Sequence, residues 1–422
     1  MKHETRCHIL MKKILDKYFI NGNFLLIIFG GFISGIGSKM YQIVVMWWIY
    51  QHTNSSGIVG IFMIASYLPG MILSIFCGML VDRINRKNII VTMDFARGIL
   101  MLIISVLFIN RIFNIIYLVI ATIMISICDV MFDPAINAMI KSVLDHNTLK
   151  KGNSINVLSK NLYKLLGPLI GGFLMLKVNV EYIILINGIS YILSAVSELF
   201  IKVNEEHIVK SKEDNKSIKN NFKVIFEFFK SRKMITQIIV TISIVNFFTC
   251  STYIILPGLI KDIGFEAINY SLLLSAMSCG SFFSAFIISI QKSDNESINT
   301  SKSQLSKSIL LYGIAMMAFS LCNNFPIMMI SYFVIGGANT VFNIVLMSLL
   351  QSEISSKSFG KIFSFISTIS LILSPISNLV FGFLGNEMKK TMIFLVIAIV
   401  LLLAGIYIRF IKEEELEEKL NV

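Results

Sequence analysis

Twelve long apolar stretches, joined by short polar loops, take up most of this 422-residue chain. A bilayer's hydrocarbon core is about 30 Å thick, and about 20 apolar residues in a helix can cross it. Backbone polar groups in lipid must bond to one another, and these runs are too long and too uniformly apolar for barrel strands. We therefore predict an all-α membrane protein with twelve transmembrane helices. We place them at residues 23–50, 56–80, 88–109, 114–139, 155–177, 180–202, 234–258, 267–290, 308–322, 326–350, 360–384 and 391–410.

Lysine and arginine are unevenly distributed between the two sides of this topology. With both termini placed in the cytoplasm, most of the 37 basic residues fall in the termini and cytoplasmic loops. The basic residues of the opposite loops are Arg111, Lys177, Lys261, Lys389 and Lys390. Because basic loops stay on the cytoplasmic side, we predict a multi-pass protein with both termini cytoplasmic. We expect its location to be a bacterial cell membrane. Its net charge of +12 then faces the anionic inner leaflet, and nucleic acid is not expected as a partner.

The sequence carries no motif for enzymatic chemistry. It has no phosphate-binding loop, no zinc-protease motif and no nucleophile elbow, and its six cysteines lack metal-binding spacing. We expect a monomer that is not an enzyme and uses no cofactor or metal.

A long polar segment divides six spans from six. It predicts an N-terminal six-helix half at residues 1–202, a cytoplasmic linker at 203–233, and a C-terminal half with a cytoplasmic tail at 234–422. Apolar residues recur at helical spacing in the linker, which predicts an amphipathic helix lying either on the inner leaflet or against protein. These residues are Ile218, Phe222, Ile225, Phe226 and Phe229.

The two halves resemble each other. Span 5 contains the stretch LGPLIGGFL at 166–174, and span 11 contains LSPISNLVFGFL at 373–384. Both have a proline two residues after a leucine, followed by glycine, phenylalanine and leucine. Two related sets of six spans are the layout of a large class of transporters that bind substrate between the halves. The pattern therefore favours a transporter.

The loop after span 2 reads GMLVDRINRK from Gly78 to Lys87. It resembles the G-x-L-A-D-R-x-G-R-K signature of the major facilitator superfamily, in which this loop latches one half to the other. The resemblance implies latch roles for Gly78, Asp82, Arg83, Arg86 and Lys87. Asn85 replaces the second glycine of the signature, and asparagine tolerates a positive φ, so we expect the turn to survive.

Span 5 contains Gly167, Pro168, Gly171 and Gly172. They resemble the G-P-x-x-G-G core of the superfamily's antiporter motif, although Tyr163 stands where a further glycine is usual. Glycines also serve helix packing alone, so both interpretations stay open.

Further patches, at 133–138, 351–354 and 359–364, resemble macrolide-efflux proteins of the drug:proton antiporter branch. That resemblance implies protons and a small amphipathic substrate as partners. The alternatives are a siderophore or metabolite exporter or an uptake system of the same fold, and a non-transporting receptor or immunity protein.

Charged residues within the spans are candidates for proton coupling. Asp129 and Asp133 lie one turn apart in span 4, and Lys160 and Lys164 lie one turn apart in span 5. Folding this hairpin at its loop puts each aspartate at the depth of one lysine, Asp133 with Lys160 and Asp129 with Lys164. A carboxylate that exchanges a lysine for a proton could couple transport, whereas a static pair would only join the helices. Lys39 in span 1 is a further candidate.

Other polar residues in the spans have weaker signals. Asp94 and Arg97, three apart in span 3, are expected to form a local ion pair that supports the loop of Asp82. Candidate polar groups of a substrate cavity are Gln42, Asn246, Thr249, Asn339 and Asn343.

The predicted orientation can be tested by cysteine labelling in a background without native cysteines. Cysteines replacing Ser217 and Ser303 should resist a membrane-impermeant thiol reagent in intact cells, and should react once the membrane is opened. A cysteine replacing Lys177 is the control and should react in intact cells. Labelling at Ser217→Cys or Ser303→Cys in intact cells would overturn the orientation.

Overall fold

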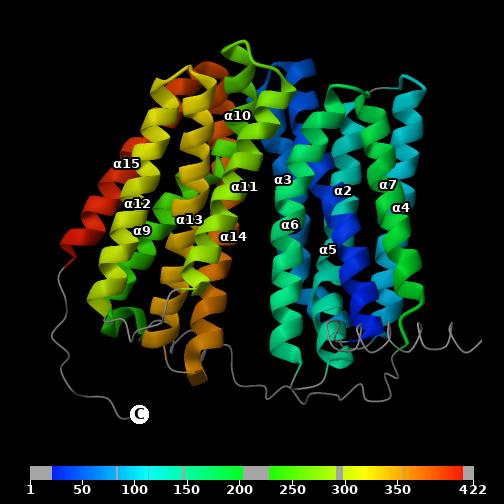
Figure 1. Cartoon of the computed structure of the whole chain (residues 1–422), viewed down its shortest axis with the longest axis horizontal. Helices are drawn as coiled ribbons and strands as arrows, with labels where there is room; N and C mark the ends of the chain where they lie inside the picture. The colour runs from blue at the N-terminus through cyan, green and yellow to red at the C-terminus, as the bar shows by residue number, and fades with distance from the viewer. Residues whose placement is uncertain are drawn as a thin grey trace, which may run out of the picture. The chain divides into compact units, whose positions relative to one another are not determined.

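A computed structural model describes residues 21–81, 84–112, 114–144, 148–202, 228–290, 298–354 and 356–411. Within these ranges each predicted span coincides with a helix, the seventh being divided into two, so the all-α fold is confirmed (Figure 1). By length and hydropathy, nine spans of the described chain qualify to cross a membrane. The helices are α2 (Gly22–Thr53), α3 (Ser56–Val81), α4 (Arg86–Ile109), α5 (Ile115–Val143), α6 (Leu149–Met175), α7 (Val180–Leu199), α9 (Lys233–Cys250), α10 (Thr252–Asp262), α11 (Ala267–Ile290), α12 (Ile298–Leu321), α13 (Phe325–Glu353), α14 (Ser356–Glu387) and α15 (Lys390–Phe410).

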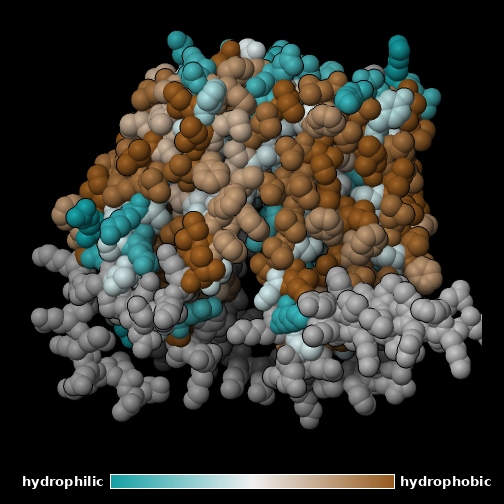
Figure 2. Space-filling view, in the orientation of Figure 1, coloured by the Kyte–Doolittle hydropathy of each residue, from teal (hydrophilic) through white to brown (hydrophobic). Residues whose placement is uncertain are grey.

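The chain forms two compact units. Unit 1 comprises residues 1–52 and 62–211, and unit 2 comprises 53–61 and 212–422. The beginning of α3 is thus grouped with unit 2, where the side chain of Asn386 accepts a hydrogen bond from the backbone of Ser56 at 2.8 Å. The space-filling view shows apolar side chains along the helices of each unit, with hydrophilic ones gathered towards the helix ends (Figure 2). Exposed leucine, isoleucine and phenylalanine side chains of this kind suit contact with lipid.

One helix pair in each unit interlocks in the same way. In unit 1, α4 packs along α7, where Gly98 faces Ile192 and Gly188 faces Leu102. In unit 2, α12 packs along α15 with the same kind of reciprocal contact at other spacings, Gly313 with Leu402 and Gly405 with Leu310. A serine hydroxyl bonds across each pair, from Ser105 to the Glu181 carbonyl at 2.9 Å and from Ser306 to the Gly405 carbonyl at 2.7 Å. The two pairs thus share a kind of packing but not its positions along the helices, and the internal repeat stays a prediction.

Small residues also let α2 approach its neighbours in unit 1. A Cβ atom added at Gly167 of α6 would lie 2.5 Å from the Cβ of Lys39 and 3.2 Å from the backbone nitrogen of Met40. At Gly30 of α2 it would lie 2.6 Å from the Ser197 hydroxyl of α7. Lipid gives no hydrophobic drive for helices to associate, so close packing at such residues supplies much of the attraction.

The seventh span is broken between α9 and α10 at Ser251. The hydroxyl of Ser251 donates to the Phe248 carbonyl at 2.6 Å, and that of Thr252 donates to the Thr249 carbonyl at 2.8 Å. Side chains that compete for helix carbonyls in this way bend or interrupt helices. Pro257 in α10 also lacks a backbone donor, which removes a helical hydrogen bond from the same region.

The structure corrects two local expectations. Asn85 has φ −58° and ψ 120°, not a positive φ. It is the N-cap of α4, and its side chain accepts a hydrogen bond from the backbone of Asn88 at 3.1 Å. We predicted the ninth span at 308–322, but α12 begins earlier, at Ile298. The prediction followed hydropathy, and the first turns of α12 are polar. The predicted linker helix lies outside the described residues except for Phe229, whose ring centroid is 5.8 Å from that of Phe365.

Replacing Gly167 with alanine should destabilise the protein. The new methyl group would overlap the Cβ of Lys39, so α2 and α6 must separate, at a cost of about 1–3 kcal/mol. Thermal unfolding of the purified protein should show a lower midpoint. Gly31→Ala is the matched control, since Gly31 lies in α2 with nothing within 4 Å of an added Cβ, and it should unfold like the wild type. Equal midpoints for both variants would contradict this account of the crossing.

Candidate functional site

Arg97 of α4 is the centre of a charged cluster in unit 1. Its Nη2 atom binds Asp94 one turn earlier, which is the local pair expected from the sequence, and its Nη1 atom binds Asp129 of α5 at 2.5 Å. Two aromatic rings cover the guanidinium, Phe132 of α5 at 4.1 Å and Tyr191 of α7 at 4.8 Å from the ring centroids. Three helices thus converge on one cation, which combines charge-assisted hydrogen bonds with cation–π contacts.

The cluster extends from a buried interior to the surface of unit 1. Asp94 is fully buried and Arg97 is 6% exposed, whereas the side chain of Asp129 is 46% exposed. Asp133, one turn further along α5, is exposed. Asp129 is therefore the carboxylate that joins the buried pair to an accessible face.

Lys39, Lys160 and Lys164 lie in the same electrostatic environment. Lys160 interacts with Asp133, so the structure brings this predicted pair together. Lys39 of α2 interacts with both Lys164 and Asp129. Its Nζ atom also donates to the Oε1 atom of Gln42 at 3.0 Å, and the Gln42 amide points to the Met63 sulfur at 3.7 Å. All five predicted coupling residues thus belong to a single cluster, which Arg97 and Asp94 extend inwards.

The partner of Asp129 differs from the sequence-based expectation. Equal depth in the span 4–5 hairpin suggested Lys164, but the ion pair of Asp129 is with Arg97. A signal for this contact was present in the sequence. Arg97 and Asp129 are equally far from position 113, in the loop between spans 3 and 4, so folding that hairpin also puts them at one depth.

The glycine motif of α6 holds Lys39 in place. Gly167 approaches the Lys39 backbone, and an added Cβ at Gly171 would lie 3.1 Å from the Met40 Cγ atom. Pro168 and Gly172 are buried in the same helix. The motif thus has a packing function here, and its link to antiport remains a proposal.

The latch loop is described only in part. Gly78 lies in α3, Arg86 and Lys87 begin α4, and Asp82 and Arg83 lie outside the described residues. The support that Asp94 and Arg97 were expected to give this loop therefore stays a prediction.

The polar cavity candidates of unit 2 are bonded within their own helices. The Asn343 amide donates to the Asn339 carbonyl at 2.7 Å and to its side-chain oxygen at 3.1 Å. Thr249 donates to the Val245 carbonyl at 2.9 Å, and Asn246 is partly buried beside it in α9. Nearby, α9 and α14 border an apolar pocket of about 510 Å³, which is lined by Phe247, Phe248 and Phe365 among others.

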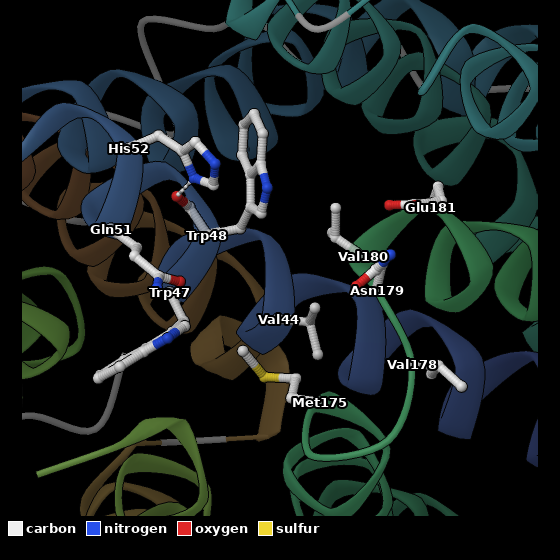
Figure 3. A pocket seen from close by; sticks show the side chains of 10 residues that line it. All are labelled: Val44, Trp47, Trp48, Gln51, His52, Met175, Val178, Asn179, Val180 and Glu181. Atoms are coloured by element: carbon white, nitrogen blue, oxygen red, sulfur yellow. Dashed lines mark hydrogen bonds between the residues drawn. The ribbon is translucent and has the colours of Figure 1, made fainter. Parts of the chain in front are cut away.

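A pocket of about 320 Å³ in unit 1 lies where α2 and α6 end and α7 begins (Figure 3). Trp48 stacks on His52 with ring centroids 4.1 Å apart, and the His52 Nδ1 atom bonds to the Trp48 carbonyl at 2.9 Å. Trp47 also lines this pocket, and it is only 6% exposed, so its ring is covered by protein and is not on the surface of the unit.

Comparison with known proteins agrees with this architecture. The sequence matches the Major Facilitator Superfamily over residues 27–295. In Bacillus subtilis (strain 168), the uncharacterized MFS-type transporter YvqJ is 20% identical over 370 residues, covering 86% of each chain. BacE of the same strain, provisionally assigned as a bacilysin exporter, is 27% identical over 228 residues, 52% of this chain and 54% of BacE.

Solved structures show the same fold at low identity. The nucleoside transporter NupG matches with a TM-score of 0.69 and 11% identity, covering 92% of this chain and 100% of that one. A bacterial homologue of the iron transporter ferroportin, in an inward-facing state, matches with a TM-score of 0.67 and 14% identity over 92% and 97% of the chains. Because the superfamily match spans more than half of its length, the chain belongs to the Major Facilitator Superfamily.

Proposed function

We propose that this transporter exports amphipathic small molecules such as macrolides in exchange for protons. The observation that carries the proposal is the ion pair between Arg97 and the half-exposed Asp129. A carboxylate at this position can be ionised and paired with Arg97, or protonated and released from it. Only the ionised form makes the ion pair that connects α5 to α4. The orientation is the predicted one, with both termini in the cytoplasm of a bacterium.

Protonation of Asp129 would change the helix contacts of unit 1. While ionised, Asp129 shares Arg97 with Asp94 and so ties α5 to α4. Once Asp129 is protonated, Arg97 keeps Asp94 as its counter-ion, so the cation stays compensated in the interior. Release of α5 is thus tolerable, as a reversible coupling step requires.

Substrate can act on the same cluster from its accessible side. Asp133 and Lys164 are exposed on unit 1, and Lys39 interacts electrostatically with Lys164 and Asp129. A bound amphipathic molecule that displaces or neutralises these charges would alter how Asp129 holds its proton, which makes substrate and proton compete. The resemblance to BacE supports export as the direction.

Neutralising Asp129 tests the coupling role. In proteoliposomes, Asp129→Asn should lose proton movement driven by erythromycin, while exchange of labelled for unlabelled erythromycin continues, since exchange needs no net proton transfer. Stability should change by about 1 kcal/mol or less, because the side chain is half exposed and Arg97 keeps Asp94.

Asp262→Asn is the matched control, because it removes an exposed ion pair of unit 2, to Lys390 at 2.7 Å, whereas the cluster belongs to unit 1. Normal proton coupling in Asp129→Asn would rule out this residue as the coupling site. Absence of substrate-dependent proton movement in the wild type, across a panel of drugs and metabolites, would instead favour a non-transporting role.

The loop after α3 is proposed to act as a conformational latch. Asp82→Asn should leave the protein inserted in the membrane but slow transport strongly, because a neutral amide accepts a weaker hydrogen bond than a carboxylate. Initial transport rates at equal surface expression measure this effect. Wild-type rates in the variant would remove the latch role from Asp82.

A further inference from the structure

Glu198 lies in the last turn of α7 and is completely buried. Neither of its carboxylate oxygens has a hydrogen-bond partner among the described residues. An ionised carboxylate without a partner is very unfavourable in the interior of a membrane protein. A protonated acid is far less costly to bury, so the environment of Glu198 favours the form that carries a proton.

The packing of α7 on α4 places this acid beside the charged cluster. The two helices run antiparallel, with Ser105 bonded to the Glu181 carbonyl and Gly98 facing Ile192. Continuing this register by one turn brings Asp94 opposite residue 196, two residues before Glu198, and Glu198 interacts electrostatically with both Asp94 and Arg97.

Spare hydrogen-bonding capacity surrounds Glu198. Asp94 binds Arg97 through its Oδ1 atom, and its Oδ2 atom has no partner within hydrogen-bond distance in the described chain, although the Ser194 side chain of α7 interacts with the carboxylate. Arg97 uses Nη1 and Nη2, while its buried Nε atom has none either. These unpartnered atoms can take part in a second arrangement of protons and hydrogen bonds around Arg97.

The charged groups that face Glu198 in the described residues are few. Asp94 and Arg97 face it from α4, and Asp129 of α5 acts through Arg97. From α2 the neighbouring stretch presents Gly30 and Ser34, which are uncharged. Arg97 is thus the described cation that can compensate Glu198 when it ionises.

We propose that Glu198 is a second proton-binding site of the transporter, which exchanges its proton with the Asp129 site through Arg97 and Asp94. With Glu198 protonated, Arg97 binds Asp94 and Asp129, as observed. When the O–H bond of Glu198 breaks and the proton leaves, Arg97 turns to the new carboxylate and releases Asp129, whose oxygen then forms an O–H bond with another proton. One proton is lost and one gained, so the net charge of the cluster is conserved.

The position of Glu198 gives the exchange a direction, which rests on the proposed function and orientation. Glu198 lies near the end of α7 that is predicted to be cytoplasmic. Beyond it, the Asn23 side chain bonds to the backbone of Lys202 in both directions, at 2.7 and 3.0 Å, which joins the beginning of α2 to the residues after α7. Glu198 is therefore suited to releasing its proton towards the cytoplasm, and the half-exposed Asp129 is suited to taking up the next one.

Glu198→Gln separates this role from a structural one. Glutamine has the shape of a protonated glutamate, so the thermal midpoint of the purified full-length protein should stay at the wild-type value. In proteoliposomes, exchange of labelled for unlabelled erythromycin should persist, while proton release driven by erythromycin should be lost. Glu198→Asp should restore proton release with a shifted pH profile.

Glu181→Gln, at the other end of α7, is the matched control, because the contact of Glu181 with α4 uses its backbone carbonyl. Wild-type proton release in Glu198→Gln would overturn the proposal. So would a parallel fall in thermal midpoint, exchange and proton release, which would show a structural role only.

An infrared measurement keeps this test independent of the substrate. The wild-type protein at neutral pH should show the carbonyl band of a protonated carboxylic acid, and that band should vanish in Glu198→Gln but stay in Glu181→Gln. If the band is present and erythromycin moves no protons, the proposed function fails while the proton site stands. If no such band distinguishes Glu198→Gln from the wild type, the proton site is overturned.

Discussion

Unit 1 depends on a single cation, Arg97, that three helices enclose. Asp94 and Asp129 balance its charge, and the rings of Phe132 and Tyr191 cover its faces. Since Asp94 and Arg97 would each be costly to bury alone, their positions are mutually determined. Rotation of α4, α5 or α7 would leave a charge without its counter-ion, which makes the arrangement specific as well as stable. For the same reason, protonation of one carboxylate changes the contacts of Arg97 with the other helices.

Hydropathy was sufficient to locate the spans, because lipid requires each of them to be a continuous apolar helix. Depth was also predictable in part: the symmetry of a hairpin about its loop relates Arg97 to Asp129 and Asp133 to Lys160. Depth alone could not choose between Arg97 and Lys164 as the partner of Asp129. That choice depends on how each helix is rotated about its axis, which the packing of the whole unit decides.

Glu198 was invisible to sequence reasoning for the same reason. An acid near the end of a span is usually read as a group at the membrane surface, and only the contact of α7 with α4 shows it to be buried. Asn85 was misjudged because a consensus glycine suggested a left-handed turn, whereas its side chain caps the next helix. Single-residue errors of this kind come from local hydrogen bonds, which the hydropathy pattern does not encode.

The interruption of the seventh span at Ser251 has a mechanical consequence. Serine and threonine hydroxyls there replace part of the normal helical bonding, so rotation at this point breaks fewer backbone hydrogen bonds than it would in an intact helix. The span thus consists of two helices that are held separately: α9 contacts α14, with the hydrogen bond from Ser377 to the Phe247 carbonyl among these contacts, and α10 buries most of its own residues against α11, α14 and α15. The direction of one part of the span can therefore differ from that of the other without loss of packing.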